Sequence, residues 1–343
     1  MKKVPVLILI IFLTGHFLFG QDIHFSQFYH ARQYINPSFT GLPPNIYRVS
    51  LHSKNQWLSV TKPYQTYLTS FDASFRINKL SSDYFSTGAL IYYDVAGDAN
   101  LSLTKFNPFL SYTFFVSENI NGLLTIGIQP GIAQRNINFY NLYFDSQFDG
   151  YSYNPDLPSN EKIETENYFY ADIGAGMHYI HFIDRETHIS GGLSLFNINK
   201  PDVSFKGAHS LGLDRRFTFY GEARLPYKTN FLLPSFYFGS QGPHKEFILG
   251  SRFMIPRSDD QFFKDNIFFR NNIILGLFYR TKDALIVYVG GEVQNFHLGL
   301  TYDINLSQLT QASHARGGFE LSVSYIWNPS KINKIQEIPC PIF

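Results

Sequence analysis

The chain has 343 residues, of which 17% are aromatic and only 16% are charged, and its net charge at pH 7 is +1. Soluble domains carry charge on about a quarter of their residues, so the composition argues against an ordinary soluble protein, and the net charge argues against nucleic acid as a partner. A bundle of membrane helices needs several apolar runs of about 20 residues, and only residues 1–20 contain anything similar. Many aromatics, few charges and a mean hydropathy of −0.12 fit a membrane β-barrel, in which apolar and polar residues alternate.

Residues 1–20 have the features of an export signal. Lys2 and Lys3 precede an apolar run from Val4 to Leu13, and the bond before Gln21 is a plausible cleavage point. A membrane anchor is disfavoured because the run is short and no basic stop-transfer cluster follows it. We therefore expect a cleaved signal peptide that sends the chain to the outer membrane.

Residues 21–45 precede the first strand-like run and contain strand-breaking residues at Asn36–Pro37, Gly41 and Pro43–Pro44. We expect this segment to lie outside the barrel wall and to occupy the lumen as a plug. Asn36, Pro37 and Gly41 have two interpretations, which the sequence leaves open. They form a docking turn for a partner, or a turn that only seats the N-terminal segment.

Residues 46–327 form a series of strand-like runs separated by turn residues. Most runs have roughly 10 to 18 residues, whereas strands of soluble proteins usually have about 5–6 and a tilted membrane strand needs about 9–11. We predict a single all-β transmembrane antiparallel barrel of 14 strands. The predicted strands are 46–53, 65–77, 84–94, 101–116, 122–139, 167–181, 187–197, 214–226, 230–241, 244–254, 267–280, 284–291, 295–304 and 314–327.

Apolar and polar residues alternate along these runs. In one run Ile126 and Ile128 share a face and Thr125 and Gln129 share the other; in the last run phenylalanine, leucine and valine oppose glutamate and serine. A period of two over this length indicates one apolar and one polar face, which we assign to lipid and to a polar lumen. The run 267–280 is an exception, because both of its faces are apolar in places.

Loop lengths predict the orientation. Several loops that follow odd-numbered runs are long, including 140–166 and 198–213, whereas most loops after even-numbered runs are short, with 255–266 as an exception. Bacterial barrels have short periplasmic turns and longer outer loops. We therefore place the odd loops outside the cell. Residues 328–343 contain Pro329, Pro339 and Pro341, which stop strand pairing, so we expect a short periplasmic tail.

The segment Gln21-Asp22, Phe25-Ser26-Gln27-Phe28, Asn36-Pro37-Ser38 and Gly41 resembles the opening of the PorP/SprF family of Bacteroidetes outer-membrane proteins, which belong to the type IX secretion system. Gln56-Trp57 followed by Tyr64, Thr66, Ser70 and Asp72 is also similar to that family, although Lys54 stands where an arginine is common. The ending is similar too, with Gly318-Phe319-Glu320-Leu321 in the final strand and Cys340-Pro341-Ile342-Phe343 at the C-terminus.

The resemblance implies a barrel that holds a secreted surface protein, often an adhesin used in gliding, and connects it to periplasmic, peptidoglycan-linked components. The sequence features described above divide the chain into a signal peptide (1–20), a plug-like segment (21–45), the barrel (46–327) and the periplasmic tail (328–343). The candidate partner-binding residues are Gln27, Phe28, Asn36, Pro37, Gly41, Gln56, Trp57, Cys340, Pro341 and Phe343. Trp57 has the alternative role of an interfacial belt residue.

No motif of a known catalytic class is present in the sequence. His178, His181 and His188 surround one short turn, but without a matching cysteine or carboxylate set they are better explained as ordinary polar residues than as a metal site. We expect no enzyme activity, no catalytic residue, no metal and no cofactor. Two rival functions remain, a passive pore for small solutes and, with less support, a barrel hydrolase.

Overall fold

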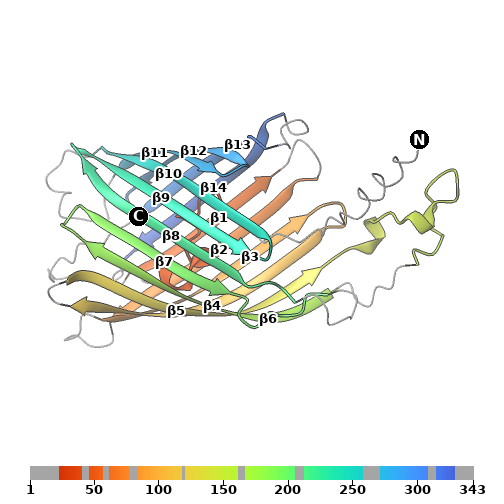
Figure 1. The fold of residues 1–343 in the computed structure, drawn as a ribbon, viewed down its shortest axis with the longest axis horizontal. Helices are drawn as coiled ribbons and strands as arrows, with labels where there is room; N and C mark the ends of the chain where they lie inside the picture. Colours follow the sequence, from red (N-terminus) through yellow and green to blue (C-terminus); the bar gives the residue numbers. More distant parts are fainter. Residues whose placement is uncertain are drawn as a thin grey trace, which may run out of the picture.

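Strands that follow one another in the chain pair side by side until the last meets the first (Figure 1). The computed structural model describes residues 23–40, 46–56, 62–76, 83–117, 120–160, 167–204, 212–257, 271–307 and 314–328. The predicted signal peptide, residues 329–343 of the predicted tail and residues Gly41, Trp57, Cys340, Pro341 and Phe343 lie outside these ranges. The strands are β1 (Tyr47–Gln56), β2 (Tyr64–Arg76), β3 (Tyr84–Ala96), β4 (Leu101–Ser117), β5 (Ile120–Asn136), β6 (Asn167–Phe182), β7 (His188–Phe196), β8 (Arg216–Tyr227), β9 (Asn230–Gln241), β10 (His244–Pro256), β11 (Asn272–Arg280), β12 (Ala284–Val293), β13 (Phe296–Asn305) and β14 (Arg316–Trp327).

The 14 strands form a closed antiparallel barrel, which confirms the predicted fold class. β1 and β14 close it over a long ladder, from the pair Tyr47–Trp327 to the pair Gln56–Gly318. Closure gives every strand two hydrogen-bonded neighbours, as a membrane requires, because hydrocarbon cannot satisfy a free strand edge. In the described part of the chain no helix is both long and apolar enough to cross a membrane.

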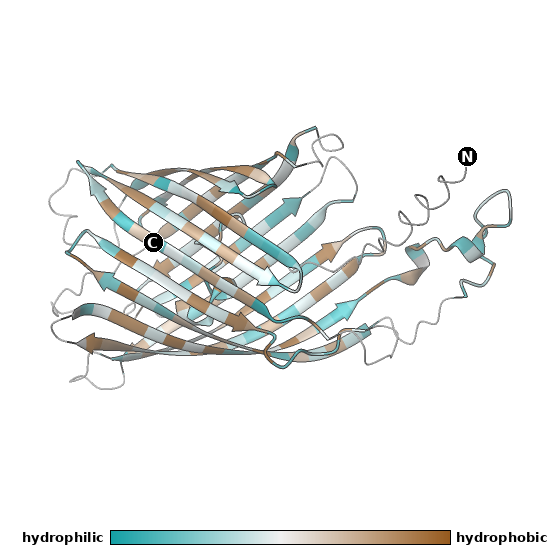
Figure 2. Cartoon of the chain, viewed as in Figure 1, coloured by the Kyte–Doolittle hydropathy of each residue, from teal (hydrophilic) through white to brown (hydrophobic). Residues whose placement is uncertain are grey.

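The alternation along the strands separates an outer and an inner face, as predicted. Ile126 and Ile128 of β5 are about half exposed, at 49% and 50%, whereas Thr125 and Gln129 are buried inside the barrel. Figure 2 shows hydrophobic residues recurring between polar ones along the strands. An outer wall that exposes isoleucine, around an inner face that carries polar residues, is the pattern of a membrane barrel, so we assign this face to lipid.

The apolar run that lacked clear alternation forms β11, which begins at Asn272 rather than at the predicted position 267. Its outer face carries Ile273, Leu275 and Leu277, and Ile274 and Phe278 on its inner face are buried in a hydrophobic cluster within the lumen. The lumen is therefore not uniformly polar. Both faces of β11 are apolar because one meets lipid and the other meets residues 23–40.

The two ends of the barrel differ in their connections. The longest connections, 137–166 and 197–215, lie at one end, here called the long-loop end, together with the short turns 97–100, 242–243 and 281–283. The opposite end, here called the short-turn end, carries 118–119, 183–187, 228–229 and 294–295, and also the longer connection 257–271. Two loops account for most of the length contrast, and the orientation derived from it stays a prediction.

Candidate functional site

Residues 23–40 form a folded segment inside the barrel, here called the lumen segment. It contains a turn at 26–30, helix α2 (Arg32–Ile35) and the 3₁₀-helix η1 (Pro37–Phe39). Most of its side chains are buried, and Ser26, Gln27 and Asn36 are fully so. Polar residues are rarely this buried unless they are hydrogen-bonded, so their partners on the wall define the site.

The first anchor joins the start of the lumen segment to β14. The carboxylate of Glu320 accepts hydrogen bonds from the backbone N–H of Ser26 at 2.8 Å and of Gln27 at 3.1 Å. The Gln27 side chain donates to the Glu320 carbonyl at 2.8 Å and accepts from the Ser322 hydroxyl at 2.6 Å. These N–H groups begin a helical turn whose own bonds leave them without partners, and hydrogen bonds to a charged acceptor are the stronger kind.

An arginine cluster surrounds the same anchor. Arg280 donates to the Ser26 hydroxyl at 2.6 Å and to Asp303 at 3.0 Å, and its Nε lies 3.0 Å from Glu246 Oε1. The Ser26 hydroxyl donates in turn to Asp303 at 2.7 Å. The Ser26 hydroxyl thus bonds to both members of a buried ion pair, so withdrawing it would leave part of that network unsatisfied.

The second anchor is Asn36, between α2 and η1. Its side-chain amide donates to the carbonyl oxygens of Met177 on β6 and Leu193 on β7, both at 3.0 Å. Its side-chain oxygen accepts from the backbone N–H of Ser38 at 2.9 Å and from the Ser38 hydroxyl at 2.6 Å. Asn36 has extended backbone angles, which the following Pro37 favours, and so it ends one helix and caps the next.

Two wall glycines admit the second anchor. A Cβ at Gly127 would lie 2.7 Å from backbone atoms of Pro37 and Ser38, and a Cβ at Gly176 would lie 2.1 Å from the Asn36 side-chain oxygen. Real Cβ contacts are not this short, so any larger residue would push the lumen segment away. These glycines on β5 and β6 let the segment approach the wall closely.

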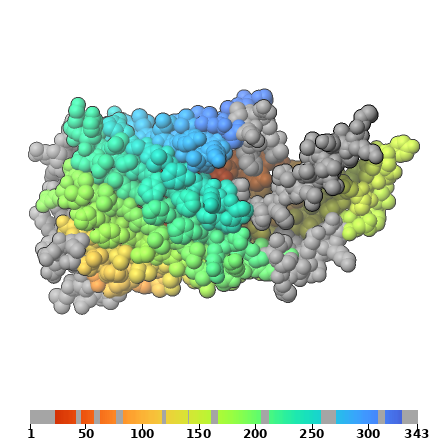
Figure 3. All heavy atoms as spheres, viewed as in Figure 1, coloured from red at the N-terminus to blue at the C-terminus, as the bar shows by residue number. Residues whose placement is uncertain are grey.

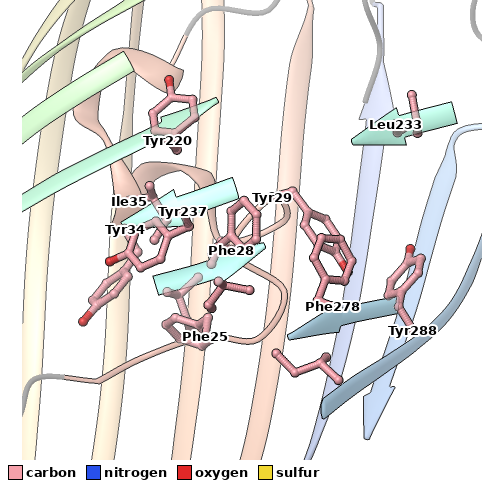
Figure 4. Close-up of a cluster of buried hydrophobic side chains, with 14 of the residues drawn as sticks. Phe25, Phe28, Tyr29, Tyr34, Ile35, Tyr220, Leu233, Tyr237, Phe278 and Tyr288 are labelled. Carbon is pink, nitrogen blue, oxygen red and sulfur yellow. The ribbon is translucent and has the colours of Figure 1, made fainter. Parts of the chain in front are cut away.

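A cluster of buried hydrophobic side chains, many of them aromatic, packs the lumen segment against the wall (Figure 4). Phe28 stacks on Tyr237 of β9 with ring centroids 5.6 Å apart, and Tyr29 stacks on Phe278 of β11 at 5.4 Å. The guanidinium of Arg252 lies 3.9 Å from the centre of the Tyr29 ring. Burial of aromatic side chains contributes much of the packing energy of a core, so the lumen segment is packed as well as hydrogen-bonded.

Charged wall residues also hold α2. Asp72 of β2 accepts from Arg48 of β1 at 2.9 Å and from the Gln33 side chain at 2.7 Å. On the other side of the lumen, Arg216 of β8 donates to the Tyr34 carbonyl at 2.9 Å and lies over its ring at 4.1 Å. The segment therefore contacts the wall on several sides.

Two histidines of the lumen segment contact polar groups of the wall. The backbone carbonyl of His24 accepts a hydrogen bond from the Lys54 ammonium, and the His24 ring lies 3.1 Å from the side-chain nitrogen of Gln56. The His30 ring lies 3.1 Å from the Tyr288 hydroxyl. These contacts add polar attachments of the lumen segment to β1 and β12.

The predicted candidate residues fall into two groups. Gln27, Phe28, Asn36 and Pro37 lie in the lumen segment and contact the wall, and Gln56, at the end of β1, has its side-chain nitrogen 3.1 Å from the His24 ring. The candidate residues Gly41, Trp57, Cys340, Pro341 and Phe343 lie outside the described ranges. Of the two interpretations of Asn36–Pro37, the contacts here are those of a seating turn, and a partner-binding role for these residues stays a prediction.

The wall residues that bind the lumen segment were not predicted as a site. Glu320, Arg280 and Asp303 lie on lumen-facing positions of their strands and are buried. In the sequence, such residues can be recognised as charged side chains on the polar face of an alternating strand. Glu320, between Phe319 and Leu321, fits this pattern, but the pattern does not indicate which group the carboxylate binds.

The three histidines near turn 183–187 make ring contacts. His178 lies 4.8 Å from the Phe39 ring, and His188 lies 6.0 Å from Phe182. Within the ranges that the structure describes, no group of three or more His, Cys, Asp or Glu side chains is arranged to hold a metal ion.

Two solved structures that resemble this chain are described as a hydrocarbon channel and a FadL homologue. The "CymD monoaromatic hydrocarbon channel" matches with a TM-score of 0.52 at 10% identity, covering 87% of this chain and 92% of that one. A "Pseudomonas aeruginosa FadL homologue" gives a TM-score of 0.44 at 7% identity, covering 85% and 92%. At such low identity the likeness to CymD shows the fold alone. No curated protein matches the chain.

A family model described as "Type IX secretion system membrane protein PorP/SprF" matches residues 18–325. The match includes the described lumen segment and nearly the whole barrel. The family and the barrel fold together place the protein in the outer membrane. The chain belongs to the PorP/SprF family of type IX secretion system membrane proteins.

Proposed function

We propose that this protein is a binding component of type IX secretion that holds a secreted surface protein, of the adhesin type, at the outer membrane and couples it to periplasmic partners. The observation that carries the proposal is a secretion-family barrel whose lumen is occupied by its own chain. Buried side chains of the lumen segment contact the wall from β1 to β14, so the interior is built as a core. Such a barrel serves as a rigid platform better than as a conduit.

The rival function of a passive pore needs an open lumen, and the packing of Phe28 and Tyr29 against the wall works against it. The rival hydrolase needs a nucleophile beside a base at the rim, and the sequence offers no catalytic motif of that kind. We therefore favour binding without catalysis. The contact regions are the loops at one end of the barrel and the C-terminal tail at the other.

The test is to purify the full-length protein from its own host and identify the proteins that accompany it. We expect a secreted surface protein and a periplasmic component, and we expect surface display of that secreted protein to be lost when the gene is deleted. Normal display in the deletion strain would refute the proposal.

A truncation after Ser330 separates coupling from folding. The strand ladder ends at Trp327, so the shortened protein should still show the heat-modifiable gel migration of a folded barrel. We expect it to lose the periplasmic component and to keep the secreted protein. A folded truncated protein that keeps both partners would exclude the tail from coupling.

A further inference from the structure

The connection between β5 and β6 projects beyond the long-loop end of the barrel. Its described part, residues 137–160, is here called the β5–β6 tip. Figures 1 and 3 show it in yellow-green, standing away from the other strands. Its base is attached to a neighbouring turn, where the backbone N–H of Asn138 donates to the Ala99 carbonyl at 2.8 Å.

The tip has a folded structure of its own. Gln147 is buried at its centre, where its side chain donates to the Leu157 carbonyl at 3.0 Å and its carbonyl accepts from the Asn154 N–H at 2.8 Å. The Asp149 carboxylate accepts from the backbone N–H groups of Tyr151 and Ser152, both at 2.8 Å. The tip is therefore preorganised, which lowers the entropy lost when a partner binds.

Large aromatic side chains on this folded tip face outward. Tyr151 is 97% exposed, Tyr143 is 77% exposed and Phe148 is 59% exposed. The Tyr143 ring packs edge-on against Tyr153 with ring centroids 4.4 Å apart, but most of its surface, like that of Phe148 and Tyr151, stays exposed, and aromatic residues are enriched in protein interfaces. Tyrosines separated by serine, glycine and asparagine are also typical of antibody binding loops.

The charge of the tip indicates the kind of partner. Residues 137–160 contain Asp145, Asp149 and Asp156 and contain no lysine, arginine, histidine or glutamate. Hydrogen bonds from Ser152 and Tyr151 lower the pKa of Asp149, which keeps it ionised. Anionic lipid and lipopolysaccharide phosphates would be repelled by three carboxylates, whereas lysine and arginine would be attracted by them and would pack on the aromatic rings.

We propose that the β5–β6 tip is the docking surface for a secreted protein that presents a basic patch. The inference rests on the proposed function and specifies which loop binds and what chemistry the partner offers. Phe148 and Tyr151 supply the apolar contact area, and Asp145 and Asp156 supply the charge complementarity.

The test compares variants of the full-length protein purified from its own host. Phe148→Ser with Tyr151→Ser removes the exposed rings and leaves Gln147 and Asp149 to hold the tip; Asp145→Lys with Asp156→Lys reverses the charge. The matched control is Tyr227→Ser, an aromatic that is 58% exposed at the short-turn end. Gel migration before and after heating scores the folding of each variant.

We expect the double-serine variant to recover at least tenfold less of the secreted protein than the wild type, the lysine variant to recover several-fold less, and the control to match the wild type. A photo-crosslinking residue in place of Tyr151 should attach to a lysine- or arginine-containing peptide of the same secreted protein. Wild-type recovery by both tip variants, or crosslinking to lipopolysaccharide alone, would overturn the inference while the proposed function stands. Absence of any secreted protein from the wild-type preparation would overturn the proposed function itself.

Discussion

Single polar side chains determine where the lumen segment sits. Glu320 binds two consecutive backbone N–H groups at one end of the segment, and Asn36 bridges the carbonyl oxygens of two strands at the other. Each buried donor or acceptor left without its partner costs about 1–3 kcal/mol. Breaking one anchor should therefore loosen the segment without unfolding the barrel, whose ladder does not depend on it.

Asn36→Ala tests the second anchor. The variant removes the amide that donates to Met177 and Leu193, so we expect hydrogen exchange of the amides in residues 27–36 to accelerate by roughly tenfold or more. Asn160→Ala, in the exposed β5–β6 connection, should leave that exchange unchanged. Equal protection in Asn36→Ala and the wild type would mean that packing alone holds the segment.

Strands carry the membrane-facing surface of the protein. β5 presents Ile126 and Ile128 outward and Thr125 and Gln129 inward. The side chains of Thr125 and Gln129 do not face a water-filled lumen, because η1 packs against the inner face of β5. Lipid and a protein core are both apolar solvents for a strand, which explains why β11 has apolar residues on both faces.

Ile128→Arg should destabilise the barrel by about 2–4 kcal/mol if position 128 lies near the middle of the bilayer, because the guanidinium would replace an isoleucine in lipid. Ile128→Leu keeps volume and polarity and should cost less than about 1.5 kcal/mol. Unfolding of both variants from lipid vesicles in denaturant gives the two values. A loss as small for arginine as for leucine would contradict the assignment of this face to lipid.

The lumen segment should act as a removable element of the barrel. Deletion of residues 23–40 removes Phe28, Tyr29 and both anchors, so we expect a larger single-channel conductance in planar bilayers than for the wild type. The tip variant Phe148→Ser with Tyr151→Ser, which leaves the lumen intact, serves as the control and should match the wild type. A wild-type protein that already conducts as well as the deletion variant would support the passive pore.

Across the whole molecule, the lumen segment passes from one end of the barrel to the other. Near its start, Gln56 at the end of β1 contacts His24, and Arg280 at the end of β11 contacts Ser26. Near its end, the Phe39 carbonyl meets Arg48, the second residue of β1. Residue 23 therefore lies at the long-loop end, opposite the short-turn end where β1 begins and β14 finishes.

The orientation of the barrel predicts which ends are reached from outside the cell. An epitope tag inserted at Gly150 should bind antibody on intact cells, and so should a tag placed before Ile23 if the long-loop end faces outward. A tag in turn 118–119 should bind only after the outer membrane is permeabilised. The reverse pattern would invert the orientation, and a Gly150 tag that is reached without the Ile23 tag would contradict the threading of the lumen segment.

The architecture of the wall could be predicted from the sequence, since strand geometry repeats every two residues and turn residues interrupt it locally. Long alternating runs gave 14 strands, an apolar face at Ile126 and Ile128, and a polar face at Glu320 and Ser322. The family motif also drew attention to Gln27 and Asn36. The contacts of Gln27 and Asn36 could not be predicted, because their partners on the wall lie far away in the sequence and no local pattern specifies them.

Only the tertiary structure decided the site. Glu320 meets Ser26 across 294 positions of the chain, and Gly127 and Gly176 matter because the lumen segment approaches them, not because of their neighbours in sequence. The local sequence Asn-Pro is the same whether the asparagine binds a partner protein or attaches the lumen segment to the wall, so the sequence cannot distinguish these two roles. The sequence by itself determined the period of the strands and their faces, because both follow from local backbone geometry. The closure of the barrel decided which polar groups meet inside it, because closure brings distant strands around one short segment.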